Sequence, residues 1–333
     1  MVSMKDIARK CGVSVATVSK ALNGQPDIGE ETRERVTATA AEMGYMTNAT
    51  ARALKTNRTY NLGVLFVDER RSGLAHEYFS SLLESFKVEA ENHGYDITFI
   101  NHNVGGRATT YLQHCRYRGV DGVVIACVDF TDPQVQELAA SGIPLVTIDY
   151  TFEGCTAVIS DNVSGVEELV RYAYRMGHRK IAYLHGENSA VTRSRLAGFR
   201  RACEELGIQV PEDYVRPCVY HDPEKCAQQT QVLLDLPDRP SCILFPDDFS
   251  YIGGQNVLLE KGLRIPEDIS VMGYDGIQLA KVMRLATYSQ NTQDLGRIAA
   301  EKLIGAIERP KTAQVERIMV PGTLMEGVTV KAL

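Results

Sequence analysis

From about residue 62 onward, short apolar segments alternate with longer amphipathic ones, and this alternation limits the possible folds more than any other feature of the chain. The apolar segments "NLGVLFV", "DITFINHN", "DGVVIAC" and "PLVTID" are separated by helical patterns such as "EYFSSLLESFKVEAENHG". Strands that are apolar throughout and joined by helices are typical of parallel sheets covered by helices on both faces. This region is therefore predicted to be α/β and Rossmann-like.

A second series of apolar segments follows the first and contains "TAVIS", "KIAYLHG", "SCILFP" and "ISVMGYD". Two α/β subdomains are therefore predicted, with a break near residues 149–161. In such sheets ligands bind beyond the carboxyl ends of the strands. Asp149, Asp247 and Asp275 end predicted strands, so they are candidate site residues, although each could instead cap the following helix.

The N-terminal part follows a different pattern, that of three short helices. In "MKDIARKCG" apolar side chains recur every three or four residues until Gly12 ends the helix. "SVATVSKALN" begins a second helix, with Ser14 as its N-cap and with Val15, Val18 and Leu22 on one face. "GEETRERVTATAAEMGY" predicts the third. Two helices joined by a short glycine-bearing turn are a helix-turn-helix signature, although a plain three-helix core would fit too.

Charge separates this N-terminal part from the rest of the chain. The whole chain has a formal charge of -6, which argues against nucleic acid. Residues 1–60, however, hold nine Lys/Arg and six Asp/Glu, whereas the remainder holds 27 and 36. A local basic excess is the electrostatic signature of polyanion binding. Short donors in the same region fit phosphates and base edges, namely Ser14, Thr17, Ser19, Lys20 and Asn23.

Several protein classes are disfavoured by what the sequence lacks. Its start, "MVSMKDIARK", has no apolar run of about 7 to 15 residues, so no signal peptide is expected. No segment has the roughly 20 apolar residues of a membrane span. A cytoplasmic protein is expected.

The eight cysteines are scattered without a Cys-x-x-Cys pair, which favours reduced thiols over disulfides or a metal site. No cofactor or metal is expected.

The segment "NATARALKTNRT", residues 48–59, allows two interpretations. It fits the Asn-x-Thr glycosylation pattern twice, which would indicate a surface loop in a secreted protein. It is also rich in helix formers, with Asn48 placed to cap a first turn. Because no secretory route is expected, the helix is favoured. So short a helix is marginal in water and needs a partner.

Three motifs, "DIARKCGVSVATVSKALNG", "YMTNATARALKTNRT" and "DISVMGYDG", together resemble the lactose-repressor/galactose-repressor (LacI/GalR) family of bacterial transcription regulators. The resemblance implies an all-α helix-turn-helix headpiece at 1–47, a hinge helix and linker at 48–60, and an effector-binding and dimerisation core at 61–333. This core would consist of two Rossmann-like subdomains, as in periplasmic binding proteins. The resemblance also implies a homodimer on a palindromic operator, switched by a small-molecule effector, with a sugar as the expected effector and repression as the default.

The same resemblance assigns DNA contacts to individual positions. Val15 and Ala16 are expected to meet base edges in the major groove, where small apolar groups contact thymine methyls and Lys20 donates to guanine. Leu54 is expected to be a wedge between base steps in the minor groove, with the paired hinge helix and DNA as the missing partners of this segment. The full expected set is Ser14, Val15, Ala16, Thr17, Ser19, Lys20, Asn23, Tyr45, Ala51, Arg52, Leu54 and Lys55. Thr47 stands where the family commonly has proline, so hinge order without DNA is expected to be lower here.

For the effector, the resemblance points to a cleft between the two subdomains. Carboxylates would accept from paired sugar hydroxyls, a guanidinium would donate through its planar fork, and an aromatic face would cover the ring. A structural Arg–Asp network is the alternative for any of these residues. The expected set is Tyr78, Phe79, Asp149, Arg195, His221, Asp247, Asp275 and Gln290.

Two other classes of function are weighed against a regulator. A sugar-transport receptor would share the core fold, but it would need export and has no use for a basic headpiece. An enzyme would be indicated by motifs such as Gly-x-Ser-x-Gly or the phosphate-binding Gly-x-x-x-x-Gly-Lys, and neither occurs in the chain. The sequence leaves open which effector and operator are bound, and whether the effector is an inducer or a corepressor.

Overall fold

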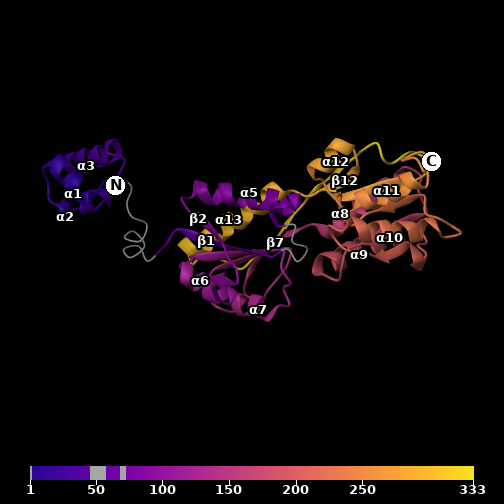
Figure 1. Cartoon of the computed structure of the whole chain (residues 1–333), viewed down its shortest axis with the longest axis horizontal. Coiled ribbons are helices and arrows are strands. Elements are labelled where there is room, and N and C mark those ends of the chain that lie inside the picture. Colours follow the sequence, from indigo (N-terminus) through magenta and orange to yellow (C-terminus); the bar gives the residue numbers. More distant parts are fainter. Residues whose placement is uncertain (1, 46–57, 68–72) are drawn as a thin grey trace. The chain divides into compact units, whose positions relative to one another are not determined.

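The computed structural model describes residues 2–45, 58–67 and 73–333. Its contacts divide the chain into two compact units, Met1–Thr59 and Tyr60–Leu333 (Figure 1). The boundary predicted between residues 47 and 48 lies outside the described residues. So does the predicted hinge helix with its four expected DNA-contacting residues, Ala51, Arg52, Leu54 and Lys55.

The N-terminal unit is a helix-turn-helix, as predicted. Helix α1 (Met4–Cys11) ends at Gly12, whose φ of 67° lies in the left-handed region that glycine adopts without strain. Helix α2 (Val15–Leu22) begins directly after Ser14, whose hydroxyl oxygen accepts a hydrogen bond of 3.0 Å from the Thr17 N–H. Helix α3 (Glu30–Glu42) packs against both.

One buried side chain from each helix forms the centre of this unit: Ile7, Val18 and Val36 are fully buried. Val15, by contrast, is 40% exposed and lies outside this buried centre. Helical side chains tilt toward the N-terminus, and Val15 is the first residue of α2. Its side chain therefore projects beyond the end of the helix rather than into the core.

The second unit contains two α/β subdomains, and the first is built on a fully parallel sheet in the order β13-β7-β6-β5-β1-β2. Its strands are β1 (Asn61–Phe66), β2 (Asp96–Phe99), β5 (Gly122–Ala126), β6 (Leu145–Ile148), β7 (Thr156–Ser160) and β13 (Arg317–Val320). Its helices are α5 (Glu77–Asn92), α6 (Tyr111–Arg118), α7 (Pro133–Ala139) and α13 (Thr292–Glu308), with a 3-10 turn η1 (Gly73–Ala75). The expected strand "DITFINHN" is divided, because β2 stops at Phe99 and a small hairpin of β3 (Asn103–Val104) and β4 (Arg107–Ala108) follows.

The second subdomain repeats this architecture with the strand order β14-β12-β11-β10-β8-β9. Its strands are β8 (Ile181–His185), β9 (Val215–Pro217), β10 (Cys242–Leu244), β11 (Ser270–Asp275), β12 (Ala286–Ser289) and β14 (Thr323–Met325). Its helices are α8 (Asn162–Arg175), α9 (Ala190–Glu205), α10 (Pro223–Leu234), α11 (Tyr251–Glu260) and α12 (Gln278–Met283), with a 3-10 turn η2 (Glu212–Tyr214). All neighbouring strands are parallel except β12 and the edge strand β14.

The chain passes between the two sheets three times, after β7, after β12 and after β13. The first passage, at residues 160–162, falls at the end of the interval in which the sequence predicts a break. The second passage returns α13 to the first sheet, where it lies beside α5 (Figure 1). A Cβ atom on Gly296 of α13 would lie 2.2 Å from the carbonyl oxygen of Leu82, so only glycine permits this approach. These passages place residues from both subdomains beside one another.

No helix within residues 2–45, 58–67 and 73–333 is long and apolar enough to cross a membrane.

Candidate functional site

The first candidate site is the exposed end of α2 in the helix-turn-helix unit. Ser14, Val15, Ala16 and Lys20 are exposed there, whereas the helix is anchored from behind by buried Val18. Thr17 and Ser19 are half-buried, and Tyr45 is half-buried against the core of the unit. The structure therefore presents the residues expected to meet base edges, in the form of a rigid helix whose other face is packed.

Several of the expected DNA-contacting side chains already have partners in this unit: the Ser14 and Thr17 hydroxyls lie 2.9 Å apart, and Lys20 and Asn23 each have a partner of their own. The Lys20 Nζ atom lies 2.5 Å from Asp27 Oδ2, and this contact holds the pKa of Asp27 below its usual range. Both side chains are about half exposed, and exposed pairs are weak, so a nucleic acid acceptor can replace the carboxylate. The Asn23 amide donates to the Ser19 carbonyl at 2.5 Å, which closes the end of α2. The second N–H of the exposed Asn23 amide stays available for a phosphate.

The second candidate site lies where the two subdomains of the core meet, and its first half is centred on Asp149. Asp149 follows β6, and its Oδ1 atom accepts a hydrogen bond of 2.7 Å from the Ser160 N–H at the end of β7. The Tyr78 hydroxyl, in the first turn of α5, donates to Asp149 Oδ2 at 3.3 Å. Burial raises the pKa of Asp149 and also that of Tyr78. The neutral forms of both groups are therefore favoured more than in water.

The other half of the site is centred on Arg195 of α9, which is 4% exposed. Its Nε donates to Asn162 Oδ1 at 2.8 Å and its Nη1 donates to the Pro246 carbonyl at 3.0 Å. The guanidinium lies over the Tyr274 ring, 3.6 Å from the centroid. Buried arginine is stabilised by this combination of aromatic and hydrogen-bond contacts.

Asp275 connects the guanidinium to the second passage between the subdomains. Its Oδ1 atom lies 3.7 Å from Arg195 Nη2 and accepts a hydrogen bond of 2.6 Å from Gln290 Nε2. Burial raises the pKa of Asp275 to about 7, against the opposing effects of Arg195 and Gln290. The carboxyl group is thus divided between its neutral and charged forms near neutral pH.

Asp247 and His221 belong to a neighbouring cluster with a different organisation. Asp247 accepts hydrogen bonds from the His221 N–H at 2.9 Å, the Ser250 N–H at 2.7 Å and the Ser250 hydroxyl at 2.7 Å. The His221 ring is stacked between His76 and Phe249, with centroids 4.2 and 4.0 Å away. The structure gives the Asp247 carboxylate a positioning task, because three inward hydrogen bonds occupy it. Its binding of an effector stays a prediction.

Phe79 extends this aromatic cluster from the first subdomain. Its ring centroid lies 4.9 Å from that of His76 and 5.5 Å from that of Phe66, which ends β1.

Six non-glycine residues among those described have positive φ, and three of them belong to the predicted effector site: Asp149 at 56°, His221 at 55° and Asp275 at 108°. Such strained backbone tends to occur at functional sites.

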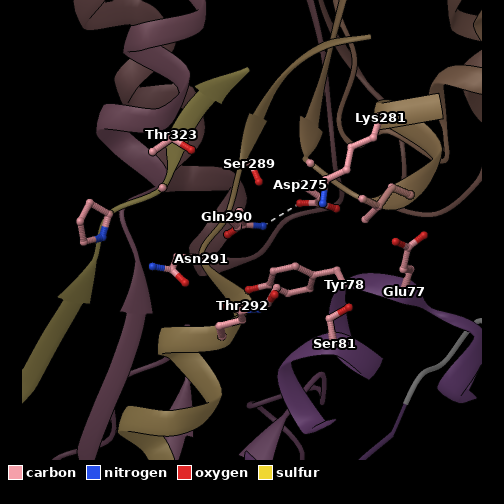
Figure 2. A pocket seen from close by; sticks show the side chains of 15 residues that line it. Glu77, Tyr78, Ser81, Asp275, Lys281, Ser289, Gln290, Asn291, Thr292 and Thr323 are labelled. Atoms are coloured by element: carbon pink, nitrogen blue, oxygen red, sulfur yellow. Dashed lines mark hydrogen bonds between the residues drawn. The ribbon is translucent and has the colours of Figure 1, made fainter. Parts of the chain in front are cut away.

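A cavity of about 320 Å³ adjoins these groups, and Figure 2 shows its lining. Of the eight predicted effector residues, only Tyr78, Asp275 and Gln290 line it, and its other polar side chains include Glu77 and Lys281. The Gln290 Oε1 atom is buried and has no hydrogen-bond partner among the described residues. A buried acceptor of this kind favours a ligand that donates a hydrogen bond.

Four residues that the sequence did not indicate complete the site. Asn162 and Tyr274 hold Arg195, and the Tyr220 ring lies 5.3 Å from the same guanidinium. Asp248, fully buried, accepts from the Gly276 N–H at 2.7 Å, the Ile277 N–H at 3.0 Å and the Thr287 hydroxyl at 2.7 Å. Asp248 thereby fixes the turn after β11. Only the motif "FPDD", which puts two acids in succession after a strand, gave a signal for it.

Comparison with known proteins matches both units of the chain. Residues 61–326 match the family described as "Periplasmic binding proteins and sugar binding domain of LacI family", and residues 3–48 match "Bacterial regulatory proteins, lacI family". The HTH-type transcriptional repressor PurR of Escherichia coli O139:H28 is 31% identical over 327 residues, which cover 95% of this chain and 94% of the relative.

Two solved structures extend the likeness. The lac repressor dimer bound to operator and the anti-inducer ONPF is 25% identical, with a TM-score of 0.80 over 99% of both chains. A LacI family transcriptional regulator from Enterococcus faecium with bound ribose is 26% identical, with a TM-score of 0.70 over 82% of this chain and 99% of that one.

A helix-turn-helix unit joined to a two-subdomain α/β core defines a DNA-binding transcriptional regulator with a ligand-binding core. This chain belongs to the LacI family, a family of transcriptional regulators and not of enzymes, and the PurR and lac proteins matched here are repressors.

Proposed function

We propose that the chain represses transcription as a homodimer on a palindromic operator, and that a sugar bound between its α/β subdomains changes its affinity for that operator. The observation that carries this proposal is the polar network of the core. Tyr78 and Asp149 come from the first subdomain, Arg195 and Asp275 come from the second, and Gln290 lies on a passage between them. A ligand held by both sides binds one arrangement of the subdomains better than another, which is the requirement for allosteric control.

The chemistry of the network supports a sugar as the ligand. Asp149 and Asp275 offer carboxyl oxygens to hydroxyl donors, and Gln290 Oε1, which has no partner within the described part of the chain, offers a further acceptor. Both acids have raised pKa values, and an anionic ligand would raise them further. A neutral polyhydroxylated molecule avoids that cost. The Enterococcus faecium relative with bound ribose supports the same class.

For DNA, we propose that α2 enters the major groove. Val15 and Ala16 would contact base edges, and Lys20 would exchange Asp27 for a guanine acceptor. Phosphates would be held by Ser14, Thr17, Ser19 and Asn23, with Tyr45 in support. The hinge segment would enter the minor groove through Ala51, Arg52, Leu54 and Lys55.

A regulator of chromosomal DNA acts in the cytoplasm of a bacterium, which is the location we propose.

Selection of binding sites from a random DNA pool by the purified full chain tests the DNA half of this proposal. The selected sites should contain an inverted repeat, and one site should bind two chains. Changing Val15 and Ala16 should alter the preferred sequence, whereas Thr17→Ala should weaken all sites alike. Selected sites without symmetry, bound by one chain, would argue against a homodimer on a palindrome.

The effector half is tested by thermal unfolding of the same protein with a panel of neutral sugars that begins with ribose. A ligand at 100 times its Kd stabilises the folded state by about 2.7 kcal/mol. The sugar that raises the unfolding temperature should also change the affinity for the selected site, and nucleosides and purines serve as comparison ligands. If only those comparison ligands bind, the sugar assignment is wrong while the cleft assignment stands.

A further inference from the structure

Two buried cysteines, Cys218 and Cys226, contact each other near the cluster formed by Asp247 and His221. The Sγ atoms of Cys218 and Cys226 lie 3.1 Å apart, and no other Sγ–Sγ hydrogen bond is found among the eight cysteines, all of which are described. Cys218 directly follows β9 and is 3% exposed, and Cys226 is in the first turn of α10 and is fully buried. The sulfur atoms in a disulfide are about 2.05 Å apart. A bond between these two requires a movement of about 1 Å.

The backbone holds both cysteines in this position. The Cys218 N–H donates to the His185 carbonyl at 2.7 Å, so Cys218 extends the pairing of β9 with β8. The Cys226 N–H donates to the Asp222 carbonyl at 3.1 Å within the cap of α10. Helix α10 packs closely against α11. A Cβ atom on Gly253 of α11 would lie 1.8 Å from the carbonyl oxygen of Pro223 in α10, so only glycine permits this approach. The proximity of the thiols is therefore a product of the fold.

The two sulfur atoms are not equivalent. The hydrogen bond from Cys226 lowers the pKa of Cys218, whereas burial raises that of Cys226. Cys218 is also the cysteine of the pair that reaches solvent, although only 3% of its surface does so. Cys218 is therefore the thiol of the pair that we assign to the first reaction with an oxidant.

We propose that Cys218 and Cys226 are a thiol pair that hydrogen peroxide oxidises to a reversible disulfide. The Cys218 thiolate sulfur attacks one peroxide oxygen, the O–O bond breaks, and the departing hydroxide takes a proton to become water. The resulting sulfenic acid sulfur is attacked by the Cys226 sulfur, whose proton leaves with the displaced hydroxide as a second water. Two thiols and one peroxide thus give one disulfide and two waters, with sulfur oxidised and peroxide reduced.

The bond would close a short loop that carries cleft residues. Tyr220, between the two cysteines, lies over Arg195, and its hydroxyl lies 2.9 Å from that of Thr192. His221, next in the chain, is tied to Asp247 through its N–H. A covalent link between β9 and α10 restricts the opening of this loop and lowers the entropy of the unfolded chain. Oxidation should therefore slow hydrogen exchange at Tyr220 and His221.

Peptide mapping of the purified, reduced full chain tests the chemistry. The protein is treated with hydrogen peroxide and then denatured in the presence of an alkylating reagent, which blocks the remaining free thiols. Trypsin then cleaves after Lys225 and so separates the two cysteines. We expect two of the eight thiols to disappear, a linked peptide pair containing Cys218 and Cys226, and full recovery of thiols with dithiothreitol. Eight persistent thiols, or a link between other cysteines, would overturn the proposal.

Matched variants separate this pair from general cysteine oxidation. Cys226→Ala should stop at a sulfenic acid on Cys218, which dimedone traps, and should lose the slower hydrogen exchange. Cys203→Ala removes a thiol of a residue that is also 3% exposed and that makes no Sγ–Sγ hydrogen bond among the described residues, and this variant should still form the link. If Cys226→Ala fails to fold, the map of the unaltered chain still decides. Unchanged hydrogen exchange at Tyr220 and His221 in the linked protein would show that the bond does not restrict the loop.

Discussion

The exposed side of α2 and the effector cleft both contain charged side chains that form an ion pair, but the two pairs differ in what surrounds them. In the N-terminal unit, Lys20 and Asp27 form an ion pair in which both side chains are about half exposed. In the core, Arg195 and Asp275 have side-chain exposures of 5% and 11%. Water already solvates the first pair, so its members can exchange partners at little cost. The second pair has lost that solvation and depends on its neighbours.

This difference predicts that DNA contacts and cleft contacts respond differently to the same kind of substitution. Loss of an exposed charge should change binding and leave folding intact. Loss of a buried charge should change folding as well, because its partners remain buried without a counterpart.

The largest effect is expected for Arg195→Ala. The substitution leaves Asn162 Oδ1 and the Pro246 carbonyl without their donor and Asp275 without its ion-pair partner. Removal of one partner from a buried ion pair costs about 3 to 5 kcal/mol. The free energy of unfolding, measured in urea, should fall by that amount. Arg193→Ala in the same helix removes an exposed arginine and should cost less than about 1 kcal/mol. Equal costs for the two variants would show that burial does not set the cost of losing the Arg195 charge.

A smaller effect is expected from pH. An unfolded aspartate has a pKa of about 3.9, whereas burial raises the pKa of Asp275 to about 7 in the folded chain. Between these values the folded state keeps a proton that the unfolded state has lost, so stability falls as pH rises through this window. The difference is at most about 4 kcal/mol.

Asp275→Asn isolates this contribution, since the pKa values of buried Asp149 and Asp248 are also raised and act in the same direction. The amide keeps an acceptor for Gln290 and cannot ionise. Relative to the variant, the unaltered chain should be more stable at pH 5 than at pH 8, as measured by urea unfolding at both values. A stability difference that is independent of pH would show that the Asp275 carboxyl is solvated well enough to ionise normally.

The sequence could predict the features that rest on local patterns. Ser14 and Gly12 predicted the turn of the N-terminal unit, and the apolar segments predicted the strands. Helix capping and the alternation of apolar with amphipathic segments depend only on residues that are neighbours in the sequence. Antiparallel β14 and the passage through residues 320–323 were not foreseen, because the three residues of β14 lie between Gly322 and Glu326 and not in an apolar segment like the "SCILFP" that contains β10.

The site shows the same division between local and distant information. The family resemblance named Arg195 and Asp275, but it did not name Asn162 or Tyr220, which reach the guanidinium from positions 33 and 25 residues away along the chain. Nor did it show that the Asp247 carboxylate is occupied by Ser250 and His221. Such contacts depend on how the elements pack, which no single motif encodes.

A third prediction concerns Leu54, which lies outside the described residues. If the hinge segment is exposed in the free chain and wedges into DNA, Leu54→Ala should weaken operator binding about tenfold or more, about 1.4 kcal/mol, without changing the unfolding temperature of the core. Leu333→Ala removes another leucine, 66% exposed, far from any expected DNA contact in sequence, and serves as the control. A change of less than about threefold in gel-shift affinity for the Leu54 variant would remove the minor-groove role.

The smallest effect is expected for Asp27→Asn, and it tests the exposed half of the comparison most directly. The carboxylate competes with DNA for Lys20 and repels phosphates, so its neutralisation should strengthen operator binding about threefold. Because exposed pairs contribute little to folding, the unfolding temperature of the N-terminal unit should hardly move. Glu34→Gln makes the same change of formal charge at an exposed position of α3. Lys20 forms its ion pair with Asp27 and not with Glu34, so this variant should have a smaller effect. Gel-shift titrations at two salt concentrations separate the outcomes. An equal gain in both variants would assign the effect to net charge alone, and a loss of affinity in the Asp27 variant would mean that the Lys20–Asp27 pair positions α2 for DNA rather than shielding it.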